Sequence, residues 1–520
     1  MTKINLNALP VMAEEKLYLD YLAGSGAAAK FFTHPPLGFS AALESRRTCT
    51  YPRRKLSQLL SEYNAKLGAH AHAMSNIDAL SKPSTFCVIG GQQAGFLGGP
   101  VYTCYKIITT IRLAQHLQNT LGERFVPVFW LASEDHDFDE INHAHFIKRD
   151  GEVGDVKFEW DQAGRPIALM PITADIRRAF AEYFEKISPG PYLSQVKERF
   201  APQAGDDYCT WQARIWSELF SDHGLVIVEP RTLRPAASGF FQFALNHVDE
   251  ISHRLDAVAE QLDTAGYIPA LNPERAGQLY TFDSNGYRVR VDEPRIRPLE
   301  DCVYSTDVAL RPLFADTVLP TVASVLGPGE ISYHAMLKPL YDLFDLPQPL
   351  FYPRKSYTIL TGSEAKRIAE YKTSPTAILI KTLDTDAVFR RLIPESESTD
   401  IFTTARRKLE EAFAPLRPYV EEIDPNLGKA WQHGLSNTMR GLDNLEQGTI
   451  KARMSHLGFS RGELRQLSNI LLPKDRLQER VFPLPYFMQR HGMKFLDSIF
   501  SAGEIEDFSH HILVMEADND

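Results

Sequence analysis

The sequence predicts an α/β fold built on a parallel sheet and followed by a long helical region. The short apolar run Phe86–Ile89 enters a glycine-rich turn that opens a helical pattern. A second apolar run, Val126–Leu131, ends in a cluster of acids and histidines. From about 361 to 471, apolar residues recur at intervals of three and four. The first two observations describe a βαβ unit, and open α/β sheets bind ligands at the carboxyl ends of such strands.

The turn after the first strand is predicted to bind an anion. Its glycines can adopt angles that other residues avoid and allow a ligand to approach closely. Pro100 suits the first turn of the helix that follows. A strand, a glycine-rich loop and a helix in this order direct backbone N–H groups toward an anion, most often phosphate. The candidate phosphate-binding residues are Gly91, Gln92, Gln93, Gly95, Gly98, Gly99 and Tyr102.

Lys106 lies near the start of this helix, where a cation is poorly matched to the helix dipole. A phosphate nearby would explain it, so Lys106 is a candidate catalytic residue; the alternative is an ordinary surface lysine. The loop is neither a GxxxxGK[ST] nor a GxGxxG motif, so any nucleotide is held in another way.

The second strand is followed by the acid–histidine cluster Glu134–Glu140, with His143 and His145 just beyond. So many acids at one strand end are unfavourable unless cations offset them. Magnesium bound with a phosphate through Glu134 and Asp135 would do so. His136 and Asp137 are candidate catalytic residues that bind phosphate or metal, or transfer a proton. Zinc is less favoured without an HExxH pattern, and a helix start rich in acids, at Asp139 and Glu140, is the structural alternative.

A second group of polar residues is predicted to bind substrate. The turn Gly327–Gly329 opens a helix whose first turn contains Glu330, a carboxylate that suits an amino group. Arginine suits bidentate binding of a carboxylate. The candidate substrate-binding residues are Arg311, Asp316, Glu330 and Tyr333. The alternative is a capped helix with solvated polar residues.

Composition indicates a large protein of the reducing cytoplasm. The chain has 520 residues, of which 44% are hydrophobic, enough for more than one domain. A net charge of −10 argues against a nucleic-acid surface. The N-terminus does not read as a signal peptide, and no apolar run reaches the roughly 20 residues of a membrane span. Five scattered cysteines suit a reducing compartment, and Cys104 reads as a small packing residue.

Four segments are expected along the chain. They are an N-terminal helical segment (1–84), the α/β core (85–360) with insertions near 148–208 and 266–310, a helical coiled-coil domain (361–471) and a C-terminal segment that returns to the core (472–520). The core also contains a strand at 225–228 and a segment that returns through 349–352. Asn285-Gly286 predicts a hairpin turn in the second insertion.

The helical domain reads as an antiparallel hairpin packed against a partner. Leu435, Leu442 and Leu445 follow the spacing of a coiled-coil seam, and Pro415 interrupts the preceding helix. One reading is a homodimer interface, and the other is a subdomain that packs within one chain. The sequence alone does not separate them.

Long motifs in the chain resemble a known family. GGQQAGFLGGPVYTCYK (90–106) and VPVFWLASEDHDFDEINH (126–143) are similar to the cysteine-adding enzymes of bacillithiol biosynthesis, a cysteine ligase family. The segments 311–341, 346–356 and 472–492 agree in the same order, so the resemblance covers nearly the whole chain.

The resemblance implies a Rossmann-like nucleotidyltransferase core with connecting-peptide insertions and a coiled-coil domain that dimerises. It implies an ATP-dependent ligase that joins the carboxylate of L-cysteine to the amine of glucosaminyl-malate, the last step to bacillithiol. In that reaction Arg311 would bind the malate part and Glu330 the amino group of cysteine. The family is related in architecture to class I aminoacyl-tRNA synthetases, which place a mobile lysine loop after a core strand. This chain has Lys355 at that position, a candidate nucleotide- or phosphate-binding residue, but the HxGH signature of the synthetases is missing. Two alternatives stay open: a related ligase acting on another amine, and a non-catalytic dimeric scaffold with a degenerate nucleotide site.

Overall fold

The computed structural model describes residues 1–135, 137–162, 164–291, 303–392 and 399–516. These residues form two compact units. The larger unit comprises 1–149, 153–359 and 475–520, and the smaller comprises 150–152 and 360–474.

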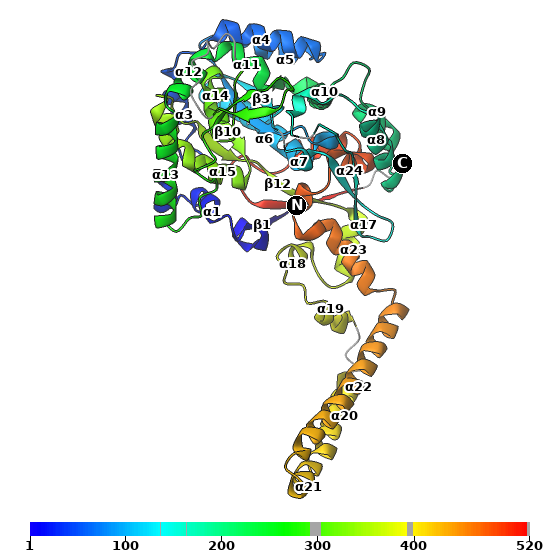
Figure 1. Ribbon diagram of the computed structural model, residues 1–520. Coiled ribbons are helices and arrows are strands. Elements are labelled where there is room, and N and C mark those ends of the chain that lie inside the picture. The colour runs from blue at the N-terminus through cyan, green and yellow to red at the C-terminus, as the bar shows by residue number, and fades with distance from the viewer. Residues whose placement is uncertain (136, 163, 292–302, 393–398, 517–520) are drawn as a thin grey trace. The chain divides into compact units, whose positions relative to one another are not determined.

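The larger unit is organised around a five-stranded sheet in which every pair of neighbours is parallel. Its strand order is β11-β10-β2-β3-β6 (Figure 1). The strands are β2 (Thr85–Gln92), β3 (Arg124–Leu131), β6 (Val226–Val228), β10 (Thr321–Leu326) and β11 (Leu350–Pro353). The predicted α/β class is confirmed, as are the strands expected near 86, 126, 225 and 350.

Strand β10 was not predicted from the sequence, although it lies between β2 and β11. All six residues of β10 are buried. Its run Thr-Val-Ala-Ser-Val-Leu is short and lacks the alternation of a half-buried strand, which is typical of a strand buried on both faces. The segment after it was predicted as a turn and a helix, at Gly327–Gly329 and Glu330.

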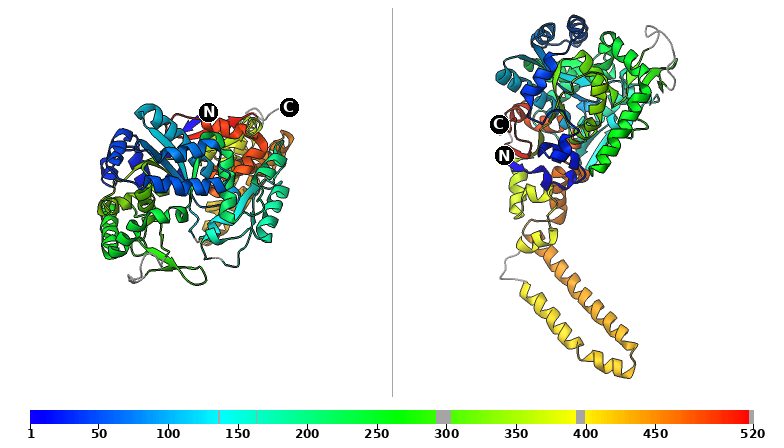
Figure 2. Two further views of the ribbon diagram at one scale, coloured as in Figure 1. Left: turned by 90° about the horizontal axis from the view of Figure 1, so that it is seen from above. Right: turned by 90° about the vertical axis from the view of Figure 1, so that its left-hand side faces the viewer.

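Helices cover this sheet. The long helix α6 (Tyr102–Leu121) contacts β2, β3 and β10, while α3 (Phe39–Arg47) contacts β10. The helices α4 (Arg53–Lys66) and α5 (Ala71–Ala79) contact β6, and these N-terminal helices gather on one side of the larger unit (Figure 2). Gly90 allows α6 to pack closely, because a Cβ there would lie 2.4 Å from Thr110 Oγ1.

Both predicted insertions contain short strands and helices. The first contains the hairpin β4 (His143–Ile147) and β5 (Val153–Lys157), then α8 (Ala174–Lys186), α9 (Leu193–Phe200) and α10 (Tyr208–Leu219). After α12 (Ser238–Asn246) and α13 (Val248–Thr264), the second forms a small sheet of β7 (Leu279–Phe282), β8 (Arg288–Arg290) and β9 (Ser305–Thr306). The predicted turn is confirmed between β7 and β8, where Gly286 has a φ of +80°. The core continues with α14 (Leu310–Val318), α15 (Pro328–His334) and α16 (Lys338–Leu343).

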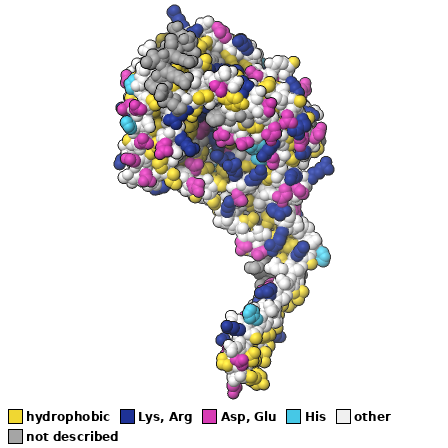
Figure 3. All heavy atoms as spheres, viewed as in Figure 1, with side chains coloured by type: hydrophobic (Ala, Val, Ile, Leu, Met, Phe, Trp, Pro, Cys, Tyr) yellow, Lys and Arg dark blue, Asp and Glu magenta, His cyan; other side chains and the backbone are white. Residues whose placement is uncertain are grey.

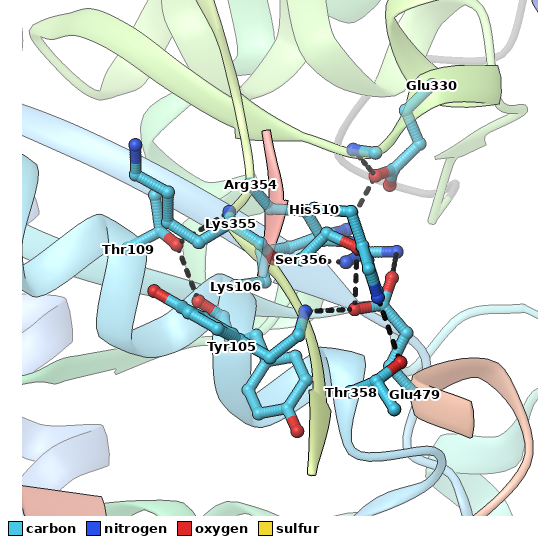
Figure 4. A network of polar contacts seen from close by, with 12 residues as sticks. Tyr105, Lys106, Thr109, Glu330, Arg354, Lys355, Ser356, Thr358, Glu479 and His510 are labelled. Atoms are coloured by element: carbon cyan, nitrogen blue, oxygen red, sulfur yellow. Dashed lines mark hydrogen bonds and ion pairs between the residues drawn. The ribbon is translucent and has the colours of Figure 1, made fainter. Parts of the chain in front are cut away.

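A third sheet joins the two ends of the chain in the order β1-β13-β12. It consists of β1 (Thr2–Ile4), β12 (Ser356–Thr361) and β13 (His510–Met515). Beside it, the carboxylate of Glu479 pairs with Arg354 at 2.7 Å and accepts hydrogen bonds from Ser356 Oγ at 3.0 Å and Tyr357 N at 2.9 Å (Figure 4). His510 lies between the hydroxyls of Ser356 and Thr358.

The smaller unit is helical. Its helices are α17 (Gly362–Glu370), α18 (Pro375–Leu379), α19 (Thr385–Leu392), α20 (Thr399–Phe413), α21 (Leu416–Ile423), α22 (Leu427–His456) and α23 (Arg461–Leu471). Helices α20 and α21 pack along α22 as the predicted hairpin, and the predicted break at Pro415 is confirmed. Trp431 Nε1 donates to the carbonyl of Phe413 at 2.8 Å, and Arg406 pairs with Asp443 at 2.8 Å.

Among the described residues, no helix is both long and apolar enough to cross a membrane.

Candidate functional site

A cleft of about 620 Å³ opens at the carboxyl ends of three neighbouring strands of the central sheet. Gly91 and Gln92 line it from β2, Trp130 from β3, and Ser324 and Leu326 from β10. This is the position at which parallel α/β sheets bind ligands. Gly91 fits here because a Cβ would lie 3.0 Å from the Trp130 carbonyl oxygen.

The remaining walls carry charges of both signs. Helices α14 and α15 contribute Arg311, Asp316, Glu330 and Tyr333, together with His334. The second insertion contributes Arg275, Tyr280, Arg288 and Thr306. Basic and acidic side chains also surround a hollow on the face of the larger unit in Figure 3.

Lys106 lies behind the cleft rather than in its lining. Its side chain is 1% exposed, and Nζ donates to Gly91 O at 2.7 Å and Gln92 Oε1 at 3.0 Å. Nζ also donates to Glu330 Oε2 at 2.6 Å (Figure 4). An ammonium has three N–H groups, so all of them are used. The anion beside Lys106 in this structure is therefore Glu330, and the surface-lysine alternative is wrong.

Glu330 presents one carboxylate oxygen to the cleft. Its Oε2 accepts from Lys106 Nζ and from Gly327 N, each at 2.6 Å, whereas Oε1 accepts no hydrogen bond from the residues that the structure describes. Burial alone would raise the pKa of Glu330, but the Lys106 ammonium outweighs burial and holds this pKa below its usual value. Glu330 is thus a fixed negative charge with a free acceptor.

Arg311, Tyr333 and His334 lie beside Glu330. Arg311 Nη2 donates to Tyr333 OH at 3.3 Å, and the Tyr333 and His334 rings stack with centroids 4.7 Å apart. Burial lowers the pKa of His334 to about 3, so its imidazole is neutral near pH 7. Its buried Nδ1 has no hydrogen-bond partner among the described residues.

Asp316 lies deep in the cleft and is 2% exposed. It accepts a hydrogen bond from Tyr341 OH at 2.6 Å, and Arg46 Nη2 lies 3.5 Å from its carboxylate. Burial raises the pKa of Asp316, and Arg46 opposes that effect. Tyr341 and Arg46 are not part of the cleft lining, so they hold the Asp316 carboxylate in place from behind the cleft wall.

The acids after β3 occupy one wall of the cleft. Glu134 forms an ion pair with Arg234, and Gln93 Nε2 donates to Asp135 Oδ2 at 2.7 Å. Asp137 is exposed and lines the cleft. Glu140 also lines it, and burial is the main cause of its raised pKa.

The two predicted magnesium ligands have protein partners in this structure, and the magnesium site stays a prediction. Arg234 already neutralises Glu134, and Asp135 is bonded to Gln93. No three His, Cys, Asp or Glu side chains within the described ranges come together as a set of metal ligands. The candidate catalytic residue His136 lies outside the described residues. The expected helix start is confirmed, with Asp139 and Glu140 in the first turn of α7 (Phe138–Ile141).

The rest of the predicted phosphate loop is packed away from the cleft. Gly98 N donates to Gln212 Oε1 at 2.9 Å, and a Cβ on Gly98 would lie 2.8 Å from the Trp216 ring. A Cβ on Gly95 would lie 2.6 Å from the Cα of Gly99. The three positions are therefore glycine because the chain packs closely there. Of the seven predicted residues of this loop and helix start, Gly91, Gln92 and Gln93 line the cleft.

Tyr102 and Lys355 also lie outside the cleft lining. The Tyr102 ring packs under the Arg354 guanidinium at 5.0 Å. Lys355 Nζ donates to the carbonyls of Glu504 and Ile505 at 2.6 and 2.7 Å and also to that of Asp507. In this structure Lys355 is thus buried against the C-terminal segment rather than in a free loop.

The cleft lining also contains residues that were not predicted as site residues, among them Arg275, Arg288, Trp130 and His334. Trp130 and His334 were read as parts of a strand and a helix. Arg288 was read only as part of a hairpin, and no local pattern distinguishes it from Arg290 two residues later. Only the tertiary structure brings them to one cleft.

Two family models match consecutive parts of the chain. Residues 4–297 and 300–355 match the description "Bacillithiol biosynthesis BshC, N-terminal Rossmann-like domain", and 357–515 match "Bacillithiol biosynthesis BshC, C-terminal coiled-coil domain".

Similar relatives carry the name "Putative cysteine ligase BshC". The protein of Geobacillus thermodenitrificans is 28% identical and is aligned over 98% of this chain and 100% of its own length. That of Chloroherpeton thalassium is 29% identical over 96% of both chains, and that of Salinibacter ruber 27% identical over 96% of both. The chain therefore belongs to the BshC family of bacillithiol biosynthesis.

Proposed function

We propose that this protein is an ATP-dependent ligase that joins the carboxylate of L-cysteine to the amine of glucosaminyl-malate. The observation that carries the proposal is that Arg311 and Glu330 line one cleft at the strand ends. An amino acid has a carboxylate and an ammonium group, which these two side chains match in charge.

Cysteine would be held by both groups. The Arg311 guanidinium would bind its carboxylate, and the free Oε1 of Glu330 would accept a hydrogen bond from its ammonium group. Lys106 keeps Glu330 ionised and fixed in place. This arrangement would leave the carboxylate of cysteine oriented for reaction.

A carboxylate is a poor electrophile, and bound ATP would supply the activation that makes it reactive. Gly91 lets a ligand approach the backbone at the end of β2. Two buried polar atoms of the lining, Trp130 Nε1 and His334 Nδ1, have no hydrogen-bond partner among the described residues. Unpaired buried groups are costly, so ligand groups that pair with them would be favoured.

The attacking amine must lose a proton. Asp137 and Glu140 line the opposite wall, and the raised pKa of Glu140 brings it closer to the range of a general base. His136 adjoins Asp137 in the sequence and remains a candidate for the same transfer.

The proposal is tested by mixing the purified chain with ATP, L-cysteine and glucosaminyl-malate. Mass spectrometry should detect the amide product, with AMP or ADP formed in equal amount. Omission of any one substrate should abolish the product. If no amide forms while the three compounds still raise the melting temperature, the site binds but does not ligate, and the enzymatic proposal is wrong.

Replacing Asp137 with asparagine should impair ligation more than folding. The side chain is exposed and lines the cleft, so its loss should leave the free energy of unfolding within about 0.5 kcal/mol of wild type. We expect turnover to fall by about tenfold or more if it assists proton transfer. Asp139→Asn, also exposed but outside the lining, is the matched control, and equal turnover in the two variants would contradict the role.

We also propose that the smaller unit mediates a homodimer. Its helices expose apolar side chains, among them Leu445 at 63%, Tyr419 at 64% and Ile423 at 65%, and yellow side chains gather along them in Figure 3. Exposed apolar patches of this kind mark interfaces. Light scattering should therefore give about twice the chain mass of 58.7 kDa.

Leu445→Asp should shift the protein to the monomer, whereas Asn444→Asp adds the same charge next to it and should leave the dimer intact. A wild-type chain that is monomeric at micromolar concentration would refute the dimer.

A further inference from the structure

Two arginines of the second insertion project into the cleft from outside the central sheet. Arg275 precedes β7, Arg288 lies on β8, and both line the cleft. They belong to the second insertion, whereas Arg311 and Glu330 belong to helices α14 and α15.

Arg288 is held firmly but keeps free donors. Its guanidinium packs on the Tyr280 ring at 4.1 Å, Nε donates to Ser305 Oγ at 2.9 Å, and Nη2 donates to the Thr306 carbonyl. Its Nη1 donates to no acceptor within the described part of the chain. The side chain is therefore pre-oriented, with one edge available to a ligand.

Arg275 is exposed, and its side chain makes no hydrogen bond or ion pair with the described residues. Two other arginines of the larger unit have carboxylate partners: Arg234 pairs with Glu134, and Arg354 pairs with Glu479. Neither Arg275 nor Arg288 has a described carboxylate within ion-pair distance. Burial lowers the pKa of Arg288, while the charges of Asp135 and Asp307 raise it. A ligand anion beside the guanidinium would add to the effect of these two carboxylates.

We propose that Arg275 and Arg288 form a subsite for two carboxylates, which are those of the malate part of the amine substrate. The inference rests on the proposed function and adds that selectivity for the dicarboxylate lies on the 266–310 insertion. A planar guanidinium fork matches a carboxylate with two parallel hydrogen bonds, so two arginines match a dicarboxylate. The amine of the same substrate would then point toward the acidic wall at Asp137 and Glu140.

The test measures binding by calorimetry, with glucosaminyl-malate, L-malate, methyl glucosaminide and ATP as separate probes. Arg275→Gln and Arg288→Gln should each weaken glucosaminyl-malate binding by about tenfold, the scale of one lost ion contact. They should leave the affinity for ATP and the KM for cysteine unchanged. Arg290→Gln, an exposed neighbour on β8 outside the lining, should match wild type.

Arg288 also supports the small sheet. Arg275 is exposed and makes no side-chain hydrogen bond or ion pair with the described residues, so its replacement keeps the test independent of folding. Unchanged affinity of Arg275→Gln for glucosaminyl-malate would overturn the subsite. A loss of ATP affinity in place of glucosaminyl-malate affinity would also overturn it, because the arginines would then bind phosphate. Wild-type protein that binds neither glucosaminyl-malate nor L-malate would also overturn it. Ligation of cysteine to methyl glucosaminide in that case would show that the ligase proposal stands without the subsite.

Discussion

Lys106→Met is expected to lower the free energy of unfolding by about 3 kcal/mol, the scale for removing one partner of a buried ion pair. The change strands the Glu330 carboxylate and leaves the Gly91 carbonyl and the Gln92 amide oxygen without their donor. Turnover should fall by at least about tenfold in the protein that remains folded, which corresponds to roughly 1.4 kcal/mol of lost transition-state stabilisation. Denaturant titration and steady-state kinetics measure the two effects.

The kinetics also separate two roles for Lys106. If Lys106 fixes Glu330, the KM for cysteine should rise while the KM for ATP stays near wild type. If it bound phosphate, the KM for ATP should rise instead. The double variant Lys106→Met/Glu330→Gln removes both charges and should recover part of the stability but none of the activity. Wild-type stability and kinetics in Lys106→Met would contradict both roles.

Glu479→Leu is expected to destabilise the larger unit by about 4 kcal/mol, because it leaves a fully buried arginine without its partner. Glu479 is 0% exposed, and it binds Arg354 and the β12 residues Ser356 and Tyr357 (Figure 4). Its loss should also release the hydroxyl that orients His510. The measurement is the midpoint and slope of denaturant unfolding.

Glu504→Leu makes the same chemical change at an exposed position of the same unit and serves as the control. It should alter stability by no more than about 0.5 kcal/mol. Equal unfolding midpoints for the two variants would show that the buried pair contributes nothing.

Local patterns in the sequence predicted the frame of the fold. The strands at β2 and β3 follow from apolar runs that end at glycines and acids, and the hairpin at Gly286 follows from its Asn-Gly turn. The break at Pro415 follows from the missing N–H of proline. Strand β10 was missed because its burial depends on two neighbouring strands, which no local pattern reveals.

The site was predictable only in part, for the same reason. Lys106 was identified as a lysine that needs an anion, but its partner, Glu330, is 224 residues away in the sequence. The glycines at 95, 98 and 99 looked like a ligand loop, whereas their close neighbours are Trp216 and one another. Arg275 and Arg288 carry no motif, and their role depends on how an insertion folds over the cleft.

The central claim is that ATP activates the carboxylate of cysteine in this cleft, and an isotope experiment tests it most directly. L-cysteine labelled with ¹⁸O in both carboxylate oxygens is converted with ATP and glucosaminyl-malate, and the products are analysed by mass spectrometry. Amide formation from an activated carboxylate leaves one labelled oxygen in the amide and transfers the other to AMP or to inorganic phosphate. We expect one ¹⁸O atom to appear in AMP or in inorganic phosphate for each amide formed. Amide formation with no label in either phosphate product would contradict it.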